Sequence, residues 1–262
     1  MYIDPHVHLR DWDEAYKETI THGLYVADIA GYTAVFDVGN TKPPVLMRDD
    51  VTRRFEIAKN ANSPVKYGVY MILTKDRKQI GDAVETCKEF YPWVALKLFA
   101  GDSTNNYGVV GYEDQGLIFK WLNEFGFNGI MMIHCEKQEH FRYAWDPQNP
   151  ITHAYARPWE SEMESVKDEI RLAKDTGFLG HIHIGHTSVP ESVYLVNEVK
   201  SQGVNISCGV TPHHLVFDMD KLRGEDGISY KMNPPLRPRS MVNELMQCLR
   251  DGLIDIIETD HA

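Results

Sequence analysis

The sequence lacks any apolar run close to the roughly 20 residues that a membrane-spanning helix needs. It also lacks an excess of basic residues, because 27 Lys and Arg oppose 38 Asp and Glu and give a formal net charge of −11. A protein that contacts nucleic acid phosphates needs a basic face. The composition therefore argues against a membrane protein and against a nucleic acid as partner.

Cysteine is scarce and forms no CxxC pair. The four cysteines are scattered, at Cys87, Cys135, Cys208 and Cys248. This pattern favours reduced thiols over a disulfide framework, and the first residues lack the charged and apolar regions of a signal peptide. We therefore expect a cytoplasmic protein. No low-complexity segment or Pro/Gly-rich linker divides the chain, and we expect a single domain over residues 1–262.

Short apolar runs rich in β-branched residues alternate with segments of helical spacing. The runs predict strands at 2–8, 33–38, 65–72, 94–99, 129–134, 180–185, 204–208 and 254–259. The segments between them predict helices at 19–30, 49–60, 78–91, 115–125, 160–176, 190–202 and 240–251. This alternation is typical of a parallel α/β sheet, and eight strands in 262 residues favour a (β/α)8 TIM barrel.

Two intervals between the predicted elements are long, after the fifth and seventh strands, and they predict extended loops on the face where barrel active sites lie. The alternative architecture is an open, doubly wound sheet. We favour the barrel because no Gly-rich dinucleotide turn follows an early strand. No helix is predicted after the eighth strand, so we expect a barrel that is incomplete at its C-terminal end, with a groove left for another segment or subunit.

Polar residues gather at the ends of the predicted strands. Residues i and i+2 of a strand face the same side, so His6 and His8 can bind one metal ion together. The other polar residues near strand ends are Asn40, Lys97, His134, His183, His186 and Asp260. Nitrogen and oxygen ligands of this kind suit zinc or a similar divalent metal. The pattern predicts a metal-dependent hydrolase.

Lys97 stands out in this set because an ammonium group is repelled by metal ions. Burial lowers the pKa of a lysine, and a neutral amine can take up carbon dioxide to form a carbamate. The two carbamate oxygens can bridge a pair of metal ions, which gives a lysine a reason to lie there.

The motifs around these residues resemble the amidohydrolase superfamily and, within it, the dihydroorotase family. They occur in order at residues 4–11, 39–41, 97–99, 134–136, 186–188, 211–215, 233–237 and 259–262. The resemblance implies two Zn²⁺ per chain. One would be held by His6, His8 and Asp260, the other by His134 and His186, and carboxylated Lys97 would bridge both.

The resemblance also implies roles for residues that contact substrate. Arg10 would grip a substrate carboxylate with two parallel hydrogen bonds, and Asn40 and Asn233 would be further contacts. Asp260 would carry the proton during hydrolysis. We expect His183 to lie behind the ligands or in the core. His213 and His214 are interpreted as loop structure.

The implied reaction is the reversible hydrolysis of L-dihydroorotate to N-carbamoyl-L-aspartate in pyrimidine biosynthesis. One alternative is a related cyclic amidohydrolase, an allantoinase or a dihydropyrimidinase. Another is a non-catalytic dihydroorotase-like subunit that supports aspartate transcarbamoylase, although such scaffolds typically lose ligands and all six positions are filled here. We also expect a homo-oligomer, such as a dimer.

Overall fold

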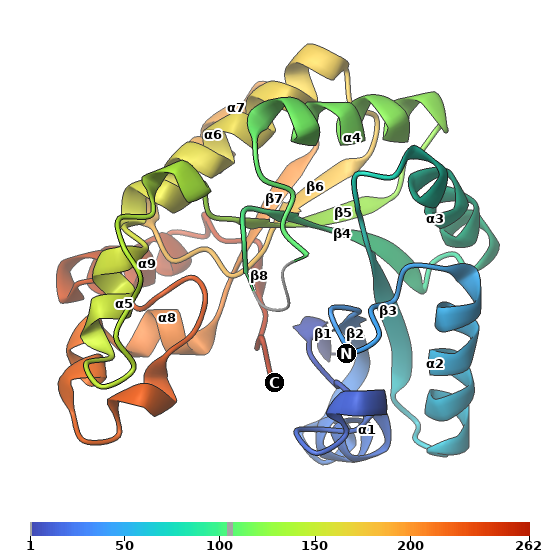
Figure 1. Cartoon of the computed structure of the whole chain (residues 1–262), viewed down its shortest axis with the longest axis horizontal. Coiled ribbons are helices and arrows are strands. Elements are labelled where there is room, and N and C mark those ends of the chain that lie inside the picture. Colours follow the sequence, from blue (N-terminus) through green and yellow to red (C-terminus); the bar gives the residue numbers. More distant parts are fainter. Residues whose placement is uncertain (1, 104–106) are drawn as a thin grey trace.

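The computed structural model describes residues 2–103 and 107–262, and its eight strands form one parallel sheet in sequential order. The sheet curves into a barrel (Figure 1). The strands are β1 (Tyr2–Val7), β2 (Tyr32–Val38), β3 (Lys66–Ile72), β4 (Val94–Ala100), β5 (Ile130–Cys135), β6 (His181–Ile184), β7 (Ile206–Val210) and β8 (Ile256–Ile257). The predicted TIM barrel is confirmed, although the last strand is much shorter than predicted.

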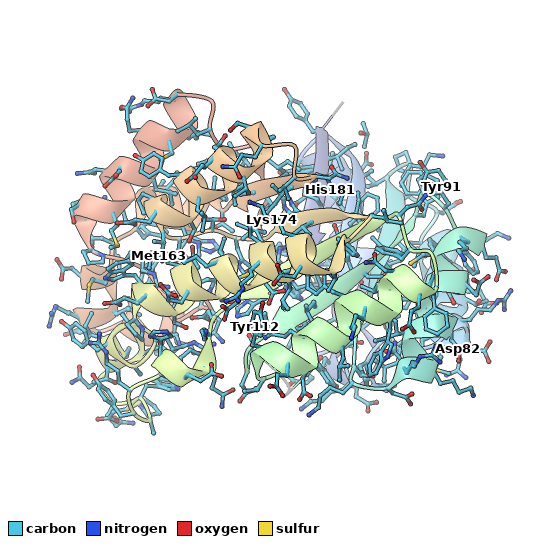
Figure 2. The ribbon with its side chains drawn as sticks, turned by 90° about the horizontal axis from the view of Figure 1, so that it is seen from above. Asp82, Tyr91, Tyr112, Met163, Lys174 and His181 are labelled. Atoms are coloured by element: carbon cyan, nitrogen blue, oxygen red, sulfur yellow. The ribbon has the colours of Figure 1, made fainter. Side chains whose placement is uncertain are left out.

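The helices lie outside the sheet, and sequential neighbours such as α3 and α4 pack side by side (Figure 2). The seven predicted helices are α1 (Ile20–Ile29), α2 (Arg48–Asn60), α3 (Arg77–Glu89), α4 (Tyr112–Glu124), α6 (Trp159–Thr176), α7 (Pro190–Ser201) and α9 (Arg239–Arg250). Their ends follow local chemistry. The Asp76 side chain accepts from two backbone N–H groups at the start of α3, and α6 ends at Gly177 with a left-handed φ of 64°. None of the helices in the described ranges could span a bilayer.

The two long loops contain short helices that the sequence pattern did not predict. They hold η3 (Gln138–His140) and α5 (Ile151–Ala156) after β5, and α8 (Pro212–Val216), η4 (Met219–Arg223) and η5 (Gly227–Tyr230) after β7. One further short turn, η1 (Trp12–Glu14), follows β1. These elements are too short to show a helical period, which explains why they were missed.

Side chains alternate along each strand, so one set packs outward against the helices and the other packs inside the barrel. The protein therefore has two apolar cores. In β4, Leu96 and Leu98 pack in the core between sheet and helices, whereas Ala95 and Phe99 pack inside the barrel. Lys97 shares the parity of Ala95 and Phe99, so its side chain belongs to the barrel interior. All seven residues of β4 are buried. A charged residue therefore enters the barrel between two apolar neighbours on the same face.

The barrel closes between β1 and the segment that follows β8. Val7 forms a parallel bridge with His261, and His8 N donates to His261 O at 2.6 Å. Deeper in the seam, the buried carboxylate of Asp4 accepts from Thr259 Oγ1 at 2.6 Å and from Thr259 N at 3.2 Å. The beginning and end of the chain are therefore adjacent (Figure 1).

Replacing Thr259 with valine should weaken this closure. The change keeps the side-chain shape but leaves the buried carboxylate of Asp4 without a hydroxyl donor, at a cost of about 1–3 kcal/mol. Urea unfolding of Thr259→Val measures the loss. As a control, Thr52→Val removes the hydroxyl of a half-buried residue of α2, which donates to the Arg48 carbonyl of its own helix at 3.2 Å, and we expect a change within about 0.5 kcal/mol. Equal stability of the two variants would contradict a special role for the seam.

Candidate metal centre

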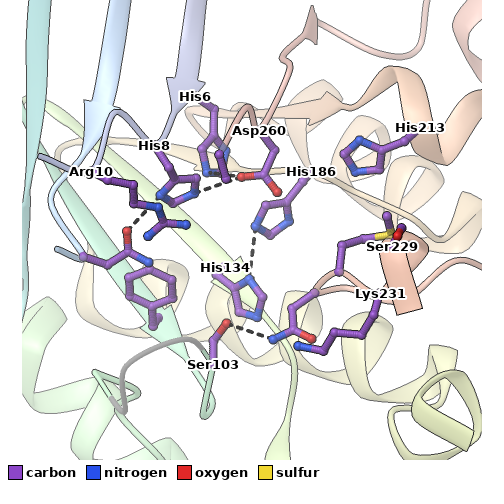
Figure 3. A pocket seen from close by; sticks show the side chains of 15 residues that line it. His6, His8, Arg10, Ser103, His134, His186, His213, Ser229, Lys231 and Asp260 are labelled. Atoms are coloured by element: carbon purple, nitrogen blue, oxygen red, sulfur yellow. Dashed lines mark hydrogen bonds and ion pairs between the residues drawn. The ribbon is translucent and has the colours of Figure 1, made fainter. Parts of the chain in front are cut away.

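A cavity of about 400 Å³ opens at the C-terminal ends of the strands, and most of the predicted site residues line it (Figure 3). The strand ends contribute His6, His8, His134, His186 and Asp260. The surrounding loops contribute Arg10, Asn40 and Asn233, the three predicted substrate contacts. Lys97 lies beneath them in the barrel interior and is fully buried.

One group of three ligand-type side chains is formed by His6, His8 and Asp260, whose ligand atoms lie within 4.8 Å of one another. Asp260 Oδ1 is 3.3 Å from His6 Nε2 and 2.9 Å from His8 Nε2. Burial and, to a smaller degree, the charge of Arg10 lower the pKa of His8 to about 4. The His8 ring is therefore neutral at physiological pH and its Nε2 lone pair can bind a metal.

The carboxylate of this group stays ionised despite its surroundings. Burial alone would raise the pKa of Asp260, but the adjacent His6 and His8 hold it well below its usual range. A neutral imidazole and an ionised carboxylate are the forms in which these side chains bind divalent metals.

The outer ring nitrogen of His8 has a hydrogen-bond partner, whereas that of His6 only faces a carboxylate. His8 Nδ1 is 2.8 Å from Asn40 Oδ1, and His6 Nδ1 is 3.5 Å from Glu258 Oε2, with no hydrogen bond to any of the described residues. At His8 the oxygen acceptor fixes the proton on Nδ1 and leaves Nε2 free for a metal. Both Nε2 atoms face Asp260, so the orientation of the rings suits a shared ion.

His134 and His186 form a second group. Their rings meet with His134 Nδ1 at 3.0 Å from His186 Nε2. Behind His134, its Nε2 is 3.0 Å from Glu136 Oε2, and Arg157 pairs with the same carboxylate oxygen at 2.6 Å. Burial lowers the pKa of both histidines. These rings are therefore neutral, the form in which imidazoles bind metals, and the Glu136 carboxylate sets which nitrogen of His134 faces inward.

Lys97 connects the two groups electrostatically. Burial lowers its pKa, the charges of Glu258 and Asp260 oppose this shift, and the resulting pKa is about 8. Its charge in turn lowers the pKa of His134 and His186. Among the described residues, Lys97 Nζ has no hydrogen-bond partner, and it lies 5.1 Å from the Phe99 ring centroid. A buried amine without a partner, between neutral imidazoles and a carboxylate, fits a site built to receive cations.

Arg10 reaches the cavity through a turn. Strand alternation does not place it beside His6 and His8, because β1 ends at Val7. Arg10, Asp11 and Trp12 then adopt left-handed φ angles of 42°, 61° and 50°. This turn directs the Arg10 side chain into the cavity (Figure 3).

The remaining residues singled out in the sequence lie around the cavity or behind it. Asn40 Oδ1 accepts from His8 Nδ1, and Asn233 Oδ1 is 3.0 Å from His153 Nε2. His183 is buried between Ser207 Oγ at 2.8 Å and Glu258 Oε2 at 3.3 Å, behind the ligands as expected. His214 is held by Thr211 and by the Pro234 carbonyl, as a loop residue would be, whereas its neighbour His213 lines the cavity.

Sequence reasoning missed three residues that build the site. Glu258 supports His6, and its other oxygen accepts from the backbone N–H of His186. Glu136 supports His134, and Lys231 lines the cavity wall. A signal existed for the two glutamates, because each lies two positions from a predicted ligand, a spacing that puts two side chains on the same face wherever a strand continues through both. Lys231 lies in an irregular loop and carries no such signal.

Comparison with known proteins gives relatives along the whole chain. No family model matches. A dihydroorotase of Brevibacillus brevis is 33% identical over 267 residues, which cover 99% of this chain and 59% of that protein. A dihydroorotase of Staphylococcus aureus (strain N315) is 31% identical over 100% of this chain and 59% of that protein. The chain therefore spans about three-fifths of the length of these curated relatives.

Solved structures with the same fold include two hydantoinases. L-Hydantoinase (dihydropyrimidinase) from Arthrobacter aurescens superposes with a TM-score of 0.84 at 21% identity, over 99% of this chain and 57% of that one. D-Hydantoinase from Bacillus sp. AR9 gives a TM-score of 0.81 at 23% identity, over 100% of this chain and 58% of that one. At this identity the likeness shows the shared barrel fold.

The variant Glu136→Gln should weaken metal binding at the second group. A neutral amide supports the His134 ring less well than a carboxylate does, and loss of such a partner typically costs 10–100-fold in metal affinity. Zn²⁺ titration against a chromophoric chelator measures the change. The control Glu139→Gln alters an exposed carboxyl three residues away and should bind as the wild type does. Unchanged affinity in Glu136→Gln would show that this carboxylate does not support a ligand.

Proposed function

Because the chain is homologous to dihydroorotases of the amidohydrolase superfamily along its entire length, we propose that it catalyses the reversible hydrolysis of L-dihydroorotate to N-carbamoyl-L-aspartate. The observation that carries this proposal is Arg10. Its side chain is buried in the cavity wall, and within the described residues its Nε and Nη1 have no hydrogen-bond partner. Two unsatisfied guanidinium donors beside a candidate metal centre call for an anionic substrate.

The arrangement of Arg10 favours a carboxylate among anions. A guanidinium fork matches a carboxylate with two parallel hydrogen bonds. Dihydroorotate carries a carboxylate on its ring, whereas simple hydantoins and dihydropyrimidines do not. This difference favours dihydroorotase over the allantoinase and dihydropyrimidinase alternatives, even though the superposed structures are hydantoinases. The filled ligand positions also argue against a purely supporting subunit.

We infer two Zn²⁺ per chain. His6, His8 and Asp260 would hold one, His134 and His186 the other, with carboxylated Lys97 between them. When bound, such ions lower the pKa of water and polarise a carbonyl oxygen. With a pKa of about 8, Lys97 has an appreciable neutral fraction near neutral pH, and the neutral amine is the form that adds to carbon dioxide with loss of a proton.

Asp260 carries the proton in the proposed reaction. It faces the cavity and is ionised, because His6 and His8 keep its pKa low against the effect of burial. It can accept a proton from the attacking water and deliver it to the ring nitrogen as the C–N bond breaks. Arg10 holds the substrate carboxylate meanwhile, so that the ring amide is presented to the centre.

We also propose a cytoplasmic location and a homo-oligomeric assembly such as a dimer. The location is supported by the four cysteines, all of which are buried and free of disulfides in the part of the chain that the structure describes. Size-exclusion chromatography with light scattering tests the assembly.

The function itself is tested by assaying the Zn²⁺-loaded chain, with bicarbonate present, on dihydroorotate, allantoin and dihydrouracil. We expect turnover of dihydroorotate alone, and Asp260→Asn should lower kcat by about 10²–10⁴-fold because it cannot accept a proton. The thermal midpoint and metal content of the variant, measured in parallel, separate loss of chemistry from loss of fold or of metal. A wild-type kcat in Asp260→Asn would remove the proposed role.

Arg10→Ala should act mainly on substrate affinity. Loss of a charged, two-bond contact costs about 1.5–3 kcal/mol, which corresponds to roughly a 10- to 100-fold rise in KM with little change in kcat. Steady-state kinetics on dihydroorotate gives both constants. The matched control Arg53→Ala removes an exposed guanidinium from α2 and should leave both constants unchanged. If KM in Arg10→Ala equals that of the control, Arg10 does not bind the carboxylate.

A further inference from the structure

Arg54 of α2 is a fully buried cation. It lies in the core where α2 meets β2, β3 and the turn that follows β1, and each of its nitrogens has a partner. Nη2 pairs with Asp37 Oδ2, Nε donates to Tyr67 Oη at 2.9 Å, and Nη1 donates to the backbone carbonyl of Arg10 at 3.0 Å. The guanidinium also lies 4.8 Å from the Trp12 ring centroid, within range of a cation–π contact.

These partners are joined to each other and to the turn. Tyr67 Oη donates to Asp37 Oδ2 at 2.7 Å, and Asp37 Oδ1 accepts from the backbone N–H of Leu9 at 2.9 Å. The buried ion pair therefore contacts the backbone at Leu9 and at Arg10. It also packs on the side chain of Trp12, so three positions of the turn depend on it.

The turn needs such support, because its backbone is strained. Arg10, Asp11 and Trp12 all have left-handed φ angles, a conformation that residues other than glycine rarely adopt. Strained backbone persists only where surrounding contacts over-determine it, and it gathers at functional sites. Asp11 supplies another contact by accepting from Ile20 N at 3.0 Å. Without these contacts, the turn would relax and redirect the Arg10 side chain.

We propose that Arg54 is a positioning residue for Arg10: through its bond to the Arg10 carbonyl and its pair with Asp37, it holds the turn that directs the Arg10 guanidinium into the cavity. The inference rests on the proposed function in that Arg10 binds the substrate carboxylate. It assigns to a residue deep in the core an effect on substrate affinity that is exerted entirely through another side chain.

The test is a double-mutant cycle of Arg54→Lys and Arg10→Ala. A lysine keeps the charge beside Asp37 but cannot also reach Tyr67 and the Arg10 carbonyl. In the wild-type background we expect KM for dihydroorotate to rise about tenfold with kcat within about twofold. In the Arg10→Ala background, Arg54→Lys should raise KM no further. An equal rise in both backgrounds would overturn the inference.

A control in another part of the barrel distinguishes an effect on substrate affinity from a general loss of stability. Val196→Ala leaves a void in the core beneath α7, far from the turn, and should lower the thermal midpoint while leaving KM unchanged. If Arg54→Lys does not fold, Tyr67→Phe replaces it in the cycle. It removes the acceptor of Arg54 Nε, and a smaller KM rise that again vanishes in the Arg10→Ala background is expected.

A crystal structure of the Arg54→Lys chain, or of Tyr67→Phe in its place, separates this inference from the proposed function. If the wild-type chain does not act on dihydroorotate, the proposed function fails, but the positioning of Arg10 can still be observed directly. We expect residues 10–12 to leave the left-handed region and the Arg10 guanidinium to leave the cavity. A turn that matches the wild-type turn would overturn the inference whatever the substrate is.

Discussion

The parallel contact between β1 and the segment that follows β8 is the interaction on which the site depends. It places His6 and His8, from the start of the chain, within ligand distance of Asp260, from its end. The Asp4 carboxylate and Thr259 hold this seam directly beneath the ligands. Because the strands between β1 and β8 pair in sequential order, His134 and His186 reach the same rim from the middle of the chain. The contacts that close the sheet are thus also the contacts that bring the residues of the candidate metal centre together.

Much of this arrangement could be predicted, because it follows from the period of apolar residues in the sequence and from the order of the strands in a parallel barrel. Alternation along a strand puts Lys97 inside the barrel, and the rule that parallel strands end on one rim gathers the histidines from β1, β5 and the end of β6. The seven long helices were predicted because each shows a helical period over three or more turns. No knowledge of distant contacts is needed for these inferences, since local pattern and topology are sufficient.

The features that could not be predicted depend on contacts between distant residues. The turn at Arg10 is held by a side chain from α2, 44 positions further along the chain. Glu258 finds its partners in β1 and after β6, and only the folded barrel brings them together. The short helices α5 and α8 lie in loops whose course is set by the barrel rim. Left-handed backbone at His186 and Asp260 is likewise imposed by the surrounding structure and has no signature in residue type.

Glu258 has a consequence for how the centre fills. One of its oxygens faces His6 and His183, and the other accepts from the main chain at His186. A single carboxylate therefore contacts a candidate ligand ring of one group, His6, and the backbone of a candidate ligand of the other group, His186. If each half of the centre held an ion as proposed, an ion bound in one half would fix this side chain and with it part of the other half. Occupancy of the two halves is consequently expected to be cooperative, with half-filled molecules less abundant than independent binding would give.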